Sequence, residues 1–439
     1  MKEPVLINNN PNIYKFKDFY YIPSVGYIYD KELSVKHFER LKHKDESKTI
    51  NFNKIYPTTI GLNITNACNL RCIYCYSETS DEKKETLSDE IIDTIVSMLM
   101  KNAIIRKMAS SEKKLPETFV ILSGGGEPTY YTEKFKTLVK RIKAIENSKI
   151  HLVTNGMFSA KTAKFIINNV DSINFSFDGT PFLQNKQRPT SKGNGSFDVI
   201  YKNIKLFDEQ KKEYSIRTTI SEENFCYIEE MSQLIFNNFK YIKSWQIESV
   251  FKSGRACNLC INQQANFSSE FDKICEYVYS NHPQKMIFNT EFSYILKDNY
   301  CAASNGTNFW IDAYGDIVEC SSVEKKDVFK IGRIDKKEII IQGNNHKEFT
   351  EYRERMLKMC KDCFIFNICA GGCPEKMLRD KHGEFINQER SAKCLYMKSY
   401  WKNKIEMVFK KKQISDIRLE LHETIEGTPI YKIVQKGEL

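Results

Sequence analysis

The chain has 439 residues, of which 41% are hydrophobic and 28% are charged, and its formal net charge is +10. This is the composition of a globular protein with about two to three domains, and it excludes a disordered chain or a small disulfide scaffold. No apolar run reaches the roughly 18 residues that a membrane span needs, so no membrane partner is expected.

The N-terminal residues and the cysteine content bear on the compartment. MKEPVLINNNPN contains no apolar segment typical of a secretion signal, so a cytoplasmic location is expected. Cytosolic thiols stay reduced, so the 14 cysteines are interpreted first as metal ligands. The positive charge alone suggests an acidic partner, but bound thiolates would offset part of it and no stacking motif accompanies the lysines. Nucleic acid is therefore not expected as a partner.

Residues 1–56 form the first expected region, an N-terminal element of one β-hairpin and one helix. YKFKDFYYIP and GYIYDKE flank a Ser-Val-Gly turn, and ELSVKHFERLKHK has helical spacing.

Residues 57–256 repeat a strand followed by an amphipathic helix. Ser88 with Asp89 and Glu90 is typical of a helix N-cap with an acidic first turn. Six β/α units in succession predict an α/β fold with a parallel sheet, either a partial barrel or a doubly wound sheet. In both architectures ligands bind at the carboxyl ends of the strands. The predicted strands are 58–65, 118–123, 150–154, 172–177, 215–220 and 244–250.

The repeat stops near residue 256. Residues 257–300 are expected to bridge to a Cys-rich region at 301–395, and the tail, 396–439, is predicted as a helix followed by a strand pair. Cys226 and Cys275 lie in helical patterns and are expected to be buried small apolar residues.

The first cysteine motif directly follows the first predicted strand. TNACNLRCIYCYSE gives Cys68, Cys72 and Cys75 the spacing C-x3-C-x2-C. A [4Fe–4S] cluster normally takes four thiolates, so three leave one iron open to another ligand. Structural zinc is the alternative, but it needs a fourth ligand nearby, and neither His37 nor His43 has ligand spacing.

This loop, with Tyr74 before its last cysteine, resembles the cluster motif of the radical S-adenosylmethionine (SAM) superfamily. The resemblance implies a partial (β/α)6 TIM-like barrel whose open iron binds the amino and carboxylate groups of SAM. It also implies one-electron cleavage of SAM to methionine and a 5′-deoxyadenosyl radical, which abstracts a substrate hydrogen.

Later strand ends are similar to the superfamily's SAM-binding motifs, in the same order. SGGGEP resembles the GGEP motif that holds the methionine amino group, the fourth strand end is where the ribose is contacted, and an arginine fork matches the carboxylate. Each segment alone could be an ordinary turn, cap or surface residue. The SAM contacts implied are Tyr74, Gly125, Gly126, Glu127, Pro128, Asn155, Ser176, Asp178 and Arg217.

Seven cysteines in residues 301–395 resemble the SPASM extension of radical SAM enzymes, which holds two auxiliary [4Fe–4S] clusters. Three [4Fe–4S] clusters and SAM are therefore the implied cofactors. The resemblance assigns to the distal auxiliary cluster Cys360, Cys363, Cys369 and Cys394, and to the nearer one Cys301, Cys320 and Cys373.

The nearer cluster is then one ligand short. Sulfatase-maturing relatives carry a further cysteine at the position that is Thr307 here. Either that cluster has an open iron or another cysteine reaches it. Cys257 and Cys260 are candidates for that ligand, and the alternatives are two free thiols or a redox pair.

The resemblance implies a peptide or protein substrate and three groups of reaction. These are oxidative crosslinking of a ribosomally made peptide (thioether, C–C or ether), formation of formylglycine in a sulfatase, and epimerisation. Sulfatase-maturing enzymes carry an aspartate base after the second SPASM cysteine, whereas Ser321 follows Cys320 here. Serine is no general base at its ordinary pKa, although Glu319 could supply one. A crosslinking peptide maturase is therefore expected, and the non-enzyme alternative is an iron–sulfur electron carrier, which needs no open iron.

The partners expected are a peptide with a leader segment and a one-electron donor of flavodoxin or ferredoxin type. Residues 1–56 are short for the winged-helix element that binds leaders in such enzymes. Leader recognition is therefore expected either to involve a separate protein or to use edge pairing with the hairpin.

Overall fold

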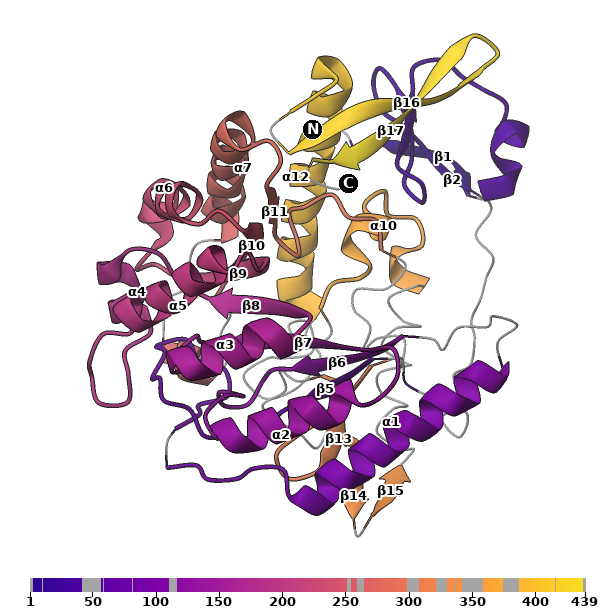
Figure 1. Ribbon diagram of the computed structural model, residues 1–439. Helices are drawn as coiled ribbons and strands as arrows, with labels where there is room; N and C mark the ends of the chain where they lie inside the picture. Colours follow the sequence, from indigo (N-terminus) through magenta and orange to yellow (C-terminus); the bar gives the residue numbers. More distant parts are fainter. Residues whose placement is uncertain are drawn as a thin grey trace. The chain divides into compact units, whose positions relative to one another are not determined.

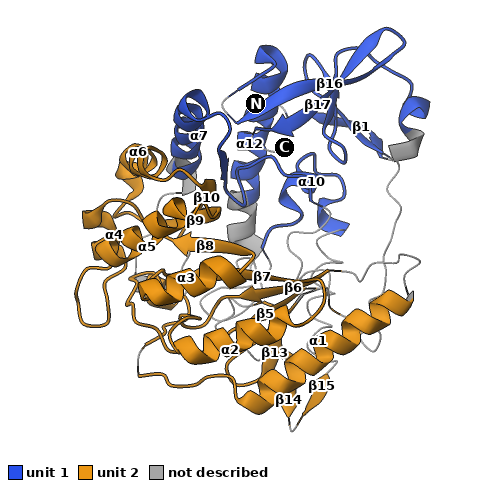
Figure 2. Ribbon diagram, in the orientation of Figure 1, with its two compact units in different colours: residues 1–49, 264–301, 350–439 blue, residues 50–263, 302–349 orange. Residues whose placement is uncertain are grey.

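The computed structural model (Figure 1) describes residues 3–9, 11–41, 57, 59–80, 82–109, 117–250, 254–258, 264–297, 308–320, 330–335, 337–341, 358–373, 387–414 and 416–436. The chain divides into two compact units (Figure 2). Unit 1 comprises residues 1–49, 264–301 and 350–439, and unit 2 comprises residues 50–263 and 302–349. No helix in the described ranges combines the length and apolar composition that crossing a membrane requires.

Unit 2 is built on a parallel sheet with the strand order β10-β9-β8-β7-β6-β5. Every neighbouring pair in this order runs parallel. The α/β fold with a parallel sheet is therefore confirmed. The strands are β5 (Thr59–Leu62), β6 (Thr118–Leu122), β7 (Ser148–Thr154), β8 (Ser172–Ser176), β9 (Tyr214–Ile220) and β10 (Ile242–Ser249).

The same sheet continues beyond β5 with strands from the predicted Cys-rich region. β12 (Asn308–Ile311) pairs with β5 in parallel. β13 (Asp316–Val318), β14 (Lys330–Asp335) and β15 (Glu338–Ile341) follow in antiparallel order. The segment that ends at Cys320 therefore belongs to the same sheet as β5, the strand that precedes the first cysteine motif.

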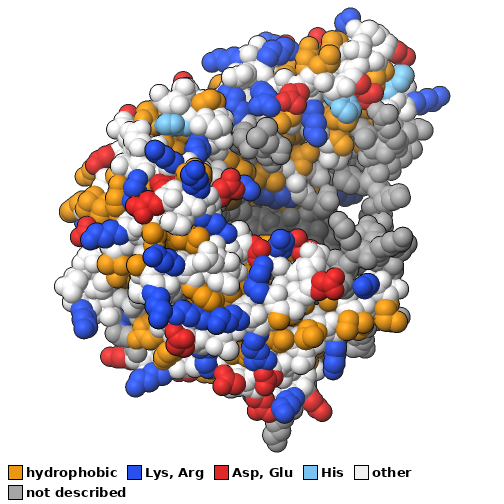
Figure 3. Space-filling view, in the orientation of Figure 1, with side chains coloured by type: hydrophobic (Ala, Val, Ile, Leu, Met, Phe, Trp, Pro, Cys, Tyr) orange, Lys and Arg blue, Asp and Glu red, His pale blue; other side chains and the backbone are white. Residues whose placement is uncertain are grey.

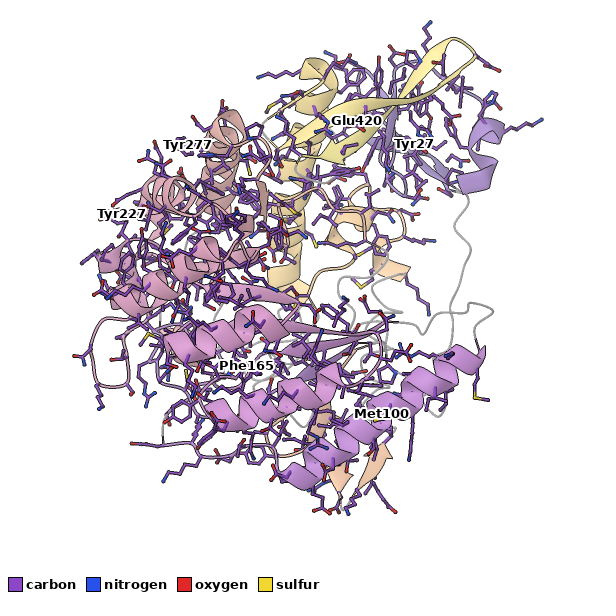
Figure 4. The ribbon with its side chains drawn as sticks, viewed as in Figure 1. Tyr27, Met100, Phe165, Tyr227, Tyr277 and Glu420 are labelled. Atoms are coloured by element: carbon purple, nitrogen blue, oxygen red, sulfur yellow. The ribbon has the colours of Figure 1, made fainter. Side chains whose placement is uncertain are left out.

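The helices of unit 2 have the caps and apolar faces that their sequences predict. Ser88 Oγ accepts from the N–H of Ile91 at 3.2 Å at the start of α1. Figure 1 shows α2 and α3 side by side across one face of the strands, and Phe165 of α3 (Figure 4) packs edge-on against Phe135 of α2 with centroids 6.2 Å apart. The helices are α1 (Asp89–Ala109), α2 (Thr132–Lys143), α3 (Ala160–Asn169), α4 (Pro181–Gln187), α5 (Phe197–Glu209), η3 (Phe225–Tyr227), α6 (Ile228–Asn238) and η4 (Gly254–Asn258).

Charged side chains of both signs cover the face shown in Figure 3, with lysines and arginines interspersed among acidic residues. Some of them pair: Lys143 lies 3.2 Å from Asp171. Such exposed pairs contribute little to stability, so packing rather than charge holds this unit together.

Unit 1 contains an antiparallel sheet with the order β1-β2-β3-β4-β17-β16. Its strands come from both ends of the chain, and Ile28 of β4 lies opposite Tyr431 of β17. Tyr27 (Figure 4) forms a 2.7 Å hydrogen bond with Nε2 of His422, which lies on β16. The strands are β1 (Val5–Asn9), β2 (Asn12–Lys15), β3 (Tyr20–Ile22), β4 (Tyr27–Tyr29), β16 (Ile417–Ile425) and β17 (Thr428–Gln435).

The predicted N-terminal hairpin corresponds to β3 and β4, and the predicted strand pair of the tail is β16 and β17. The segment expected to be helical near the N-terminus forms the 3₁₀ helix η1 over Val35–Leu41. The remaining elements of unit 1 are α7 (Gln264–Asn281), β11 (Met286–Phe288), α10 (Phe366–Cys369) and α12 (Asn387–Lys411).

Candidate active site

The loop after β5 carries the three cysteines of the first motif. The Cys68 N–H donates to the Ser80 carbonyl at 3.1 Å and the Cys75 N–H donates to the Cys72 carbonyl at 3.3 Å, so the loop folds back on itself. Burial is the main cause that raises the pKa of Cys68 to about 11 and that of Cys72 to about 12, and neighbouring thiols add to it. These mutual effects place the three thiols within electrostatic range of one another.

Three such thiols fit a [4Fe–4S] cluster with one open iron. Among the described residues, no three Cys, His, Asp or Glu side chains converge on a single metal ion. In a cluster each thiolate binds a different iron, so its ligands stand further apart than around one ion. The positive charge of an iron core would also offset the cost of burying thiolates here.

The glycine-rich loop after β6 packs against the backbone just before Cys68. The Gly126 N–H donates to the Thr65 carbonyl at 2.7 Å, and the Glu127 N–H donates to the Ala67 carbonyl at 2.8 Å. A Cβ at Gly126 would lie 2.0 Å from the Ala67 oxygen, a distance that no side chain tolerates. The glycine at position 126 is therefore required for the close approach of this loop to the cysteine loop.

Glu127 is buried and accepts four hydrogen bonds from the protein. Its Oε1 accepts from Thr129 Oγ1 at 2.7 Å, from the Thr129 N–H at 3.1 Å and from Thr154 Oγ1 at 2.6 Å, and its Oε2 accepts from the Asn155 N–H at 2.8 Å. Burial raises the pKa of Glu127, and these bonds oppose the rise. The carboxylate thus joins the carboxyl ends of β6 and β7, and its contact with the SAM ammonium stays a prediction.

Asn155 links the end of β7 to the cysteine loop. Its Nδ2 donates to Asn69 Oδ1 at 2.8 Å and lies 3.7 Å from Cys68 Sγ, while its Oδ1 accepts from the Met157 N–H at 2.8 Å. Hydrogen bonds to ligand sulfurs tune the reduction potential of iron–sulfur clusters. The structure therefore brings Asn155 close to Cys68, a predicted cluster ligand.

Tyr74 and Asp178, both expected to contact SAM, meet each other in a buried group. The Tyr74 hydroxyl donates to Asp178 Oδ2, and the Thr219 N–H donates to Asp178 Oδ1 at 3.1 Å. Arg188, which sequence reasoning missed, donates from Nη1 to the Tyr74 hydroxyl at 2.7 Å and lies 4.0 Å from Asp178. Nothing in the QNKQRPTS segment marks this arginine, because its hydrogen bond joins it to Tyr74, which lies 114 positions away in the sequence.

Ser176 and Arg217 lie opposite each other on β8 and β9. Arg217 is exposed, and no carboxylate of the described residues pairs with it. Burial chiefly raises the pKa of Tyr76, and Cys75 and Cys320 raise it further, whereas the positive charge of Arg217 lowers it. An arginine available for a ligand carboxylate therefore lies within electrostatic range of the residue that follows Cys75.

Arg255, in the GRA segment after β10, was not among the predicted site residues. Its N–H donates to the Cys75 carbonyl at 3.0 Å, its Nε donates to the Cys72 carbonyl at 2.8 Å, and its Nη1 donates to the Thr79 carbonyl at 3.2 Å. The backbone and side chain of this one residue thus bind three carbonyls of the cysteine loop. A positive charge directly after a strand end, where ligands bind, was the available sequence signal.

The C-terminal cysteines are divided between the units. In unit 1, burial chiefly raises the pKa of Cys363 to about 11, and Cys360 and Cys394 raise it further. These three thiols therefore lie near one another. Cys320 lies in unit 2, and Cys369 and Cys373 lie in unit 1. Cys301 and the side chains of Cys257 and Cys260 fall outside the described residues. The cluster assignments of these seven cysteines stay predictions.

The two remaining cysteines differ from each other. Cys275 is buried in α7 as expected, but the expectation of a buried Cys226 is wrong, because η3 leaves it exposed. None of the residues of this short 3₁₀ helix is buried, so it offers no buried face for the thiol.

Known proteins share this sequence pattern and fold. Residues 62–235 match the Radical SAM superfamily. The chain is 25% identical over 363 residues to a cysteine-type anaerobic sulfatase-maturating enzyme of Clostridium novyi, over 77% of this chain and 92% of that protein. It is 24% identical over 330 residues to the antilisterial bacteriocin subtilosin biosynthesis protein AlbA of Bacillus subtilis, over 72% of this chain and 67% of that protein.

Solved structures show the same architecture. Native anSMEcpe with bound AdoMet and Cp18Cys peptide superposes with a TM-score of 0.59 at 17% identity, covering 81% of this chain and 99% of that one. Streptococcus suis SuiB bound to S-adenosylmethionine superposes with a TM-score of 0.54 at 15% identity, covering 76% of each chain. The chain therefore contains a radical SAM domain at residues 62–235. More narrowly, its α/β fold is that of the radical SAM enzymes with a SPASM domain.

Proposed function

We propose that this enzyme binds a [4Fe–4S] cluster through Cys68, Cys72 and Cys75 and cleaves SAM at it. When bound, the cluster would supply one electron to SAM, and the cleaved SAM would give methionine and a 5′-deoxyadenosyl radical. The supporting observation is a three-thiol loop at the carboxyl ends of the strands, in which Cys72 is buried, with the exposed Arg217 within electrostatic range. Arg217 matches the SAM carboxylate because a guanidinium binds carboxylates through two parallel hydrogen bonds.

We further propose that the substrate is a ribosomally made peptide that receives an oxidative crosslink. Each crosslink removes two hydrogens: one as an atom taken by the deoxyadenosyl carbon, the other as a proton, with one electron passing to an iron–sulfur acceptor. The observation that carries this proposal is Ser321 after Cys320, where sulfatase-maturing enzymes have an aspartate base. Relatives include the subtilosin biosynthesis protein, and SuiB has been solved with its precursor peptide SuiA.

Formation of formylglycine in a sulfatase is the second candidate. The relatives named as sulfatase-maturating enzymes favour it, since one of them is similar over 92% of its length. This reaction needs a base near the substrate, and Glu319, which is fully buried at the end of β13, is the acidic residue next to Cys320. Epimerisation remains an outcome that the same experiment detects.

We also propose the auxiliary clusters, the electron donor and the site of leader recognition. Two auxiliary [4Fe–4S] clusters would be held by the seven C-terminal cysteines, giving three clusters in all. A low-potential donor of flavodoxin or ferredoxin type would supply electrons in the cytoplasm. The leader of the peptide would bind either the N-terminal strands or a separate protein.

The test is anaerobic co-expression of the enzyme with any short peptide encoded beside its gene, followed by intact-mass measurement. A loss of two hydrogens per site, mapped between two side chains by fragmentation, supports a crosslinking maturase. An unchanged mass with deuterium uptake from heavy water indicates epimerisation and overturns the crosslink.

The control variants separate SAM cleavage from substrate choice. Replacing Cys68, Cys72 and Cys75 with Ala should abolish formation of 5′-deoxyadenosine, whereas Cys226→Ala, at an exposed thiol, should leave it unchanged. Persistent cleavage in the triple variant contradicts the cluster assignment. Formylglycine in a co-expressed sulfatase, with an unmodified peptide, would establish the second candidate.

A further inference from the structure

Residues 187–191, which begin at the last residue of α4, form a strap along the cysteine loop. The Ile73 N–H donates to the Gln187 carbonyl at 3.0 Å, and the Arg71 N–H donates to the Pro189 carbonyl at 2.7 Å. The ladder continues where the Ser191 N–H donates to the Asn69 carbonyl at 3.0 Å, beside an antiparallel bridge between Leu70 and Thr190. The strap therefore runs along the stretch between Cys68 and Cys75.

The backbone of Arg188, within this strap, is held from both sides. Its N–H donates to the Gln184 carbonyl at 2.8 Å, and its carbonyl accepts from Ser196 Oγ at 2.7 Å. Gln184 in turn donates from Nε2 to Ser196 Oγ at 3.1 Å and accepts from the Asp178 N–H at 2.7 Å. These contacts fix where the guanidinium can reach.

The Arg188 side chain is buried, with 9% of it exposed, next to a fully buried Asp178. It lies over the Tyr74 ring, with the guanidinium carbon 5.8 Å from the centroid, and it interacts electrostatically with the Cys72 thiol. Its Nε is buried with no hydrogen-bond partner among the described residues. One carboxylate balances this cation in the thiol form of the site, and a bound cluster would bring additional negative charge.

We propose that Arg188 is a positioning residue that holds a buried positive charge beside the radical SAM cluster and thereby raises its reduction potential. The inference rests on the proposed cluster at Cys68, Cys72 and Cys75. Reduction adds one electron from an external low-potential donor and makes the cluster and its thiolates one unit more negative. A fixed cation in a poorly solvated site stabilises the more negative state more strongly, because charges interact more strongly at low dielectric.

The test compares cluster-loaded wild type with Arg188→Gln and Arg188→Lys. The midpoint potential is followed by electron paramagnetic resonance, using the signal that changes on addition of SAM to identify the cluster with the open iron. At the wild-type midpoint, the reduced-to-oxidised ratio of R188Q should be about tenfold lower, which for one electron is about 59 mV. R188K keeps the charge and should recover most of the ratio.

Arg141→Gln is the matched control. It removes one positive charge from α2, where Arg141 pairs with Asp93 at the surface, and it should leave the ratio unchanged. Tyr74→Phe removes the hydroxyl that Arg188 contacts but keeps the cation, so it should shift the ratio much less than R188Q does.

An R188Q protein that holds the same iron and has the wild-type ratio overturns the inference. R188K behaving like R188Q also overturns it, because the charge would then not matter. Should R188Q fail to fold, R188K and Tyr74→Phe decide: both near wild type supports the inference, and both strongly shifted refutes it. If wild type itself binds no SAM-responsive cluster, the proposed function fails first, which is a distinct result.

Discussion

The Glu127 carboxylate accepts the backbone N–H of Asn155 at 2.8 Å, and through this bond the glycine-rich loop after β6 is joined to the end of β7. Both partners also contact the cysteine loop: the Glu127 N–H donates to the Ala67 carbonyl, and Asn155 Nδ2 lies 3.7 Å from Cys68 Sγ. Three successive loops at one edge of the sheet are therefore a single hydrogen-bonded assembly.

Glu127→Gln should weaken this assembly. The amide nitrogen of Gln would face hydroxyl or N–H donors, leaving at least one buried donor without an acceptor, at a cost of about 1–3 kcal/mol. The free energy of unfolding from urea titration measures the loss. Glu133→Gln, which replaces an exposed carboxylate that pairs with Lys136, is the control and should change nothing measurable. Equal stability of both variants would contradict the role of Glu127.

Gly126→Ala should displace the cysteine loop, because its Cβ would lie 2.0 Å from the Ala67 oxygen. Overpacking of this kind costs about 1–3 kcal/mol, and the iron content after reconstitution should fall. Gly193→Ala tests backbone strain alone, since Gly193 has a φ of +78° and, apart from its chain neighbours, no atom of the described residues lies within 4 Å of an added Cβ. That control should keep its iron, and loss of iron from both variants would argue against a specific contact at Gly126.

Arg217→Ala should weaken SAM binding about 10–100-fold, because charge-assisted hydrogen bonds contribute about 1.5–3 kcal/mol each. Equilibrium dialysis of SAM against the cluster-loaded protein measures the dissociation constant. Lys243→Ala removes an exposed cation near the N-terminal end of β10, the strand next to β9, and should leave the dissociation constant of SAM unchanged. An unchanged affinity in Arg217→Ala would remove this residue from the SAM site.

Stability should decline in mildly acidic solution partly because of His151. Burial lowers the pKa of His151, whose Nδ1 lies 2.8 Å from Ser172 Oγ. Below the unfolded pKa of about 6.5 the unfolded chain binds more protons than the folded chain, so the free energy of unfolding falls until the folded pKa is passed. Denaturant titrations between about pH 8 and pH 5 should show a shallower decline for His151→Gln. An identical decline in both proteins would assign the effect to other groups.

Lys404 in α12 is the cation of a buried network in unit 1. Its Nζ lies 2.8 Å from Asp272 Oδ1 and 2.7 Å from Asp416 Oδ2. Lys404→Met removes the cation that faces these carboxylates and should lower the free energy of unfolding by about 3–5 kcal/mol. Lys402→Met, which breaks a partly exposed pair with Glu406 at 3.1 Å, should cost less than about 1 kcal/mol. Similar costs for both variants would show that the network is not stabilising.

Local patterns were sufficient for the strands of the parallel sheet. Alternating and continuous apolar runs predicted the six parallel strands, because a buried strand needs that pattern whatever its neighbours are. Parallel strands also end at one edge of their sheet, so motifs after successive strands, such as Cys68 and Glu127, had to lie together.

Pairings between distant segments needed the tertiary structure. β4 pairs with β17 across almost the whole chain, and β12 pairs with β5, although neither partner's sequence specifies the other. Arg188 reaches Tyr74 because the strap hydrogen-bonds to the cysteine loop, a contact that leaves no periodicity in either segment. The sequence by itself thus determined which strands form and which residues follow each of them, since both depend on neighbouring residues. Only the tertiary structure decided which charges and edges meet, because main-chain hydrogen bonds between strands are the same for every sequence and the choice of partner depends on the packing of the whole unit.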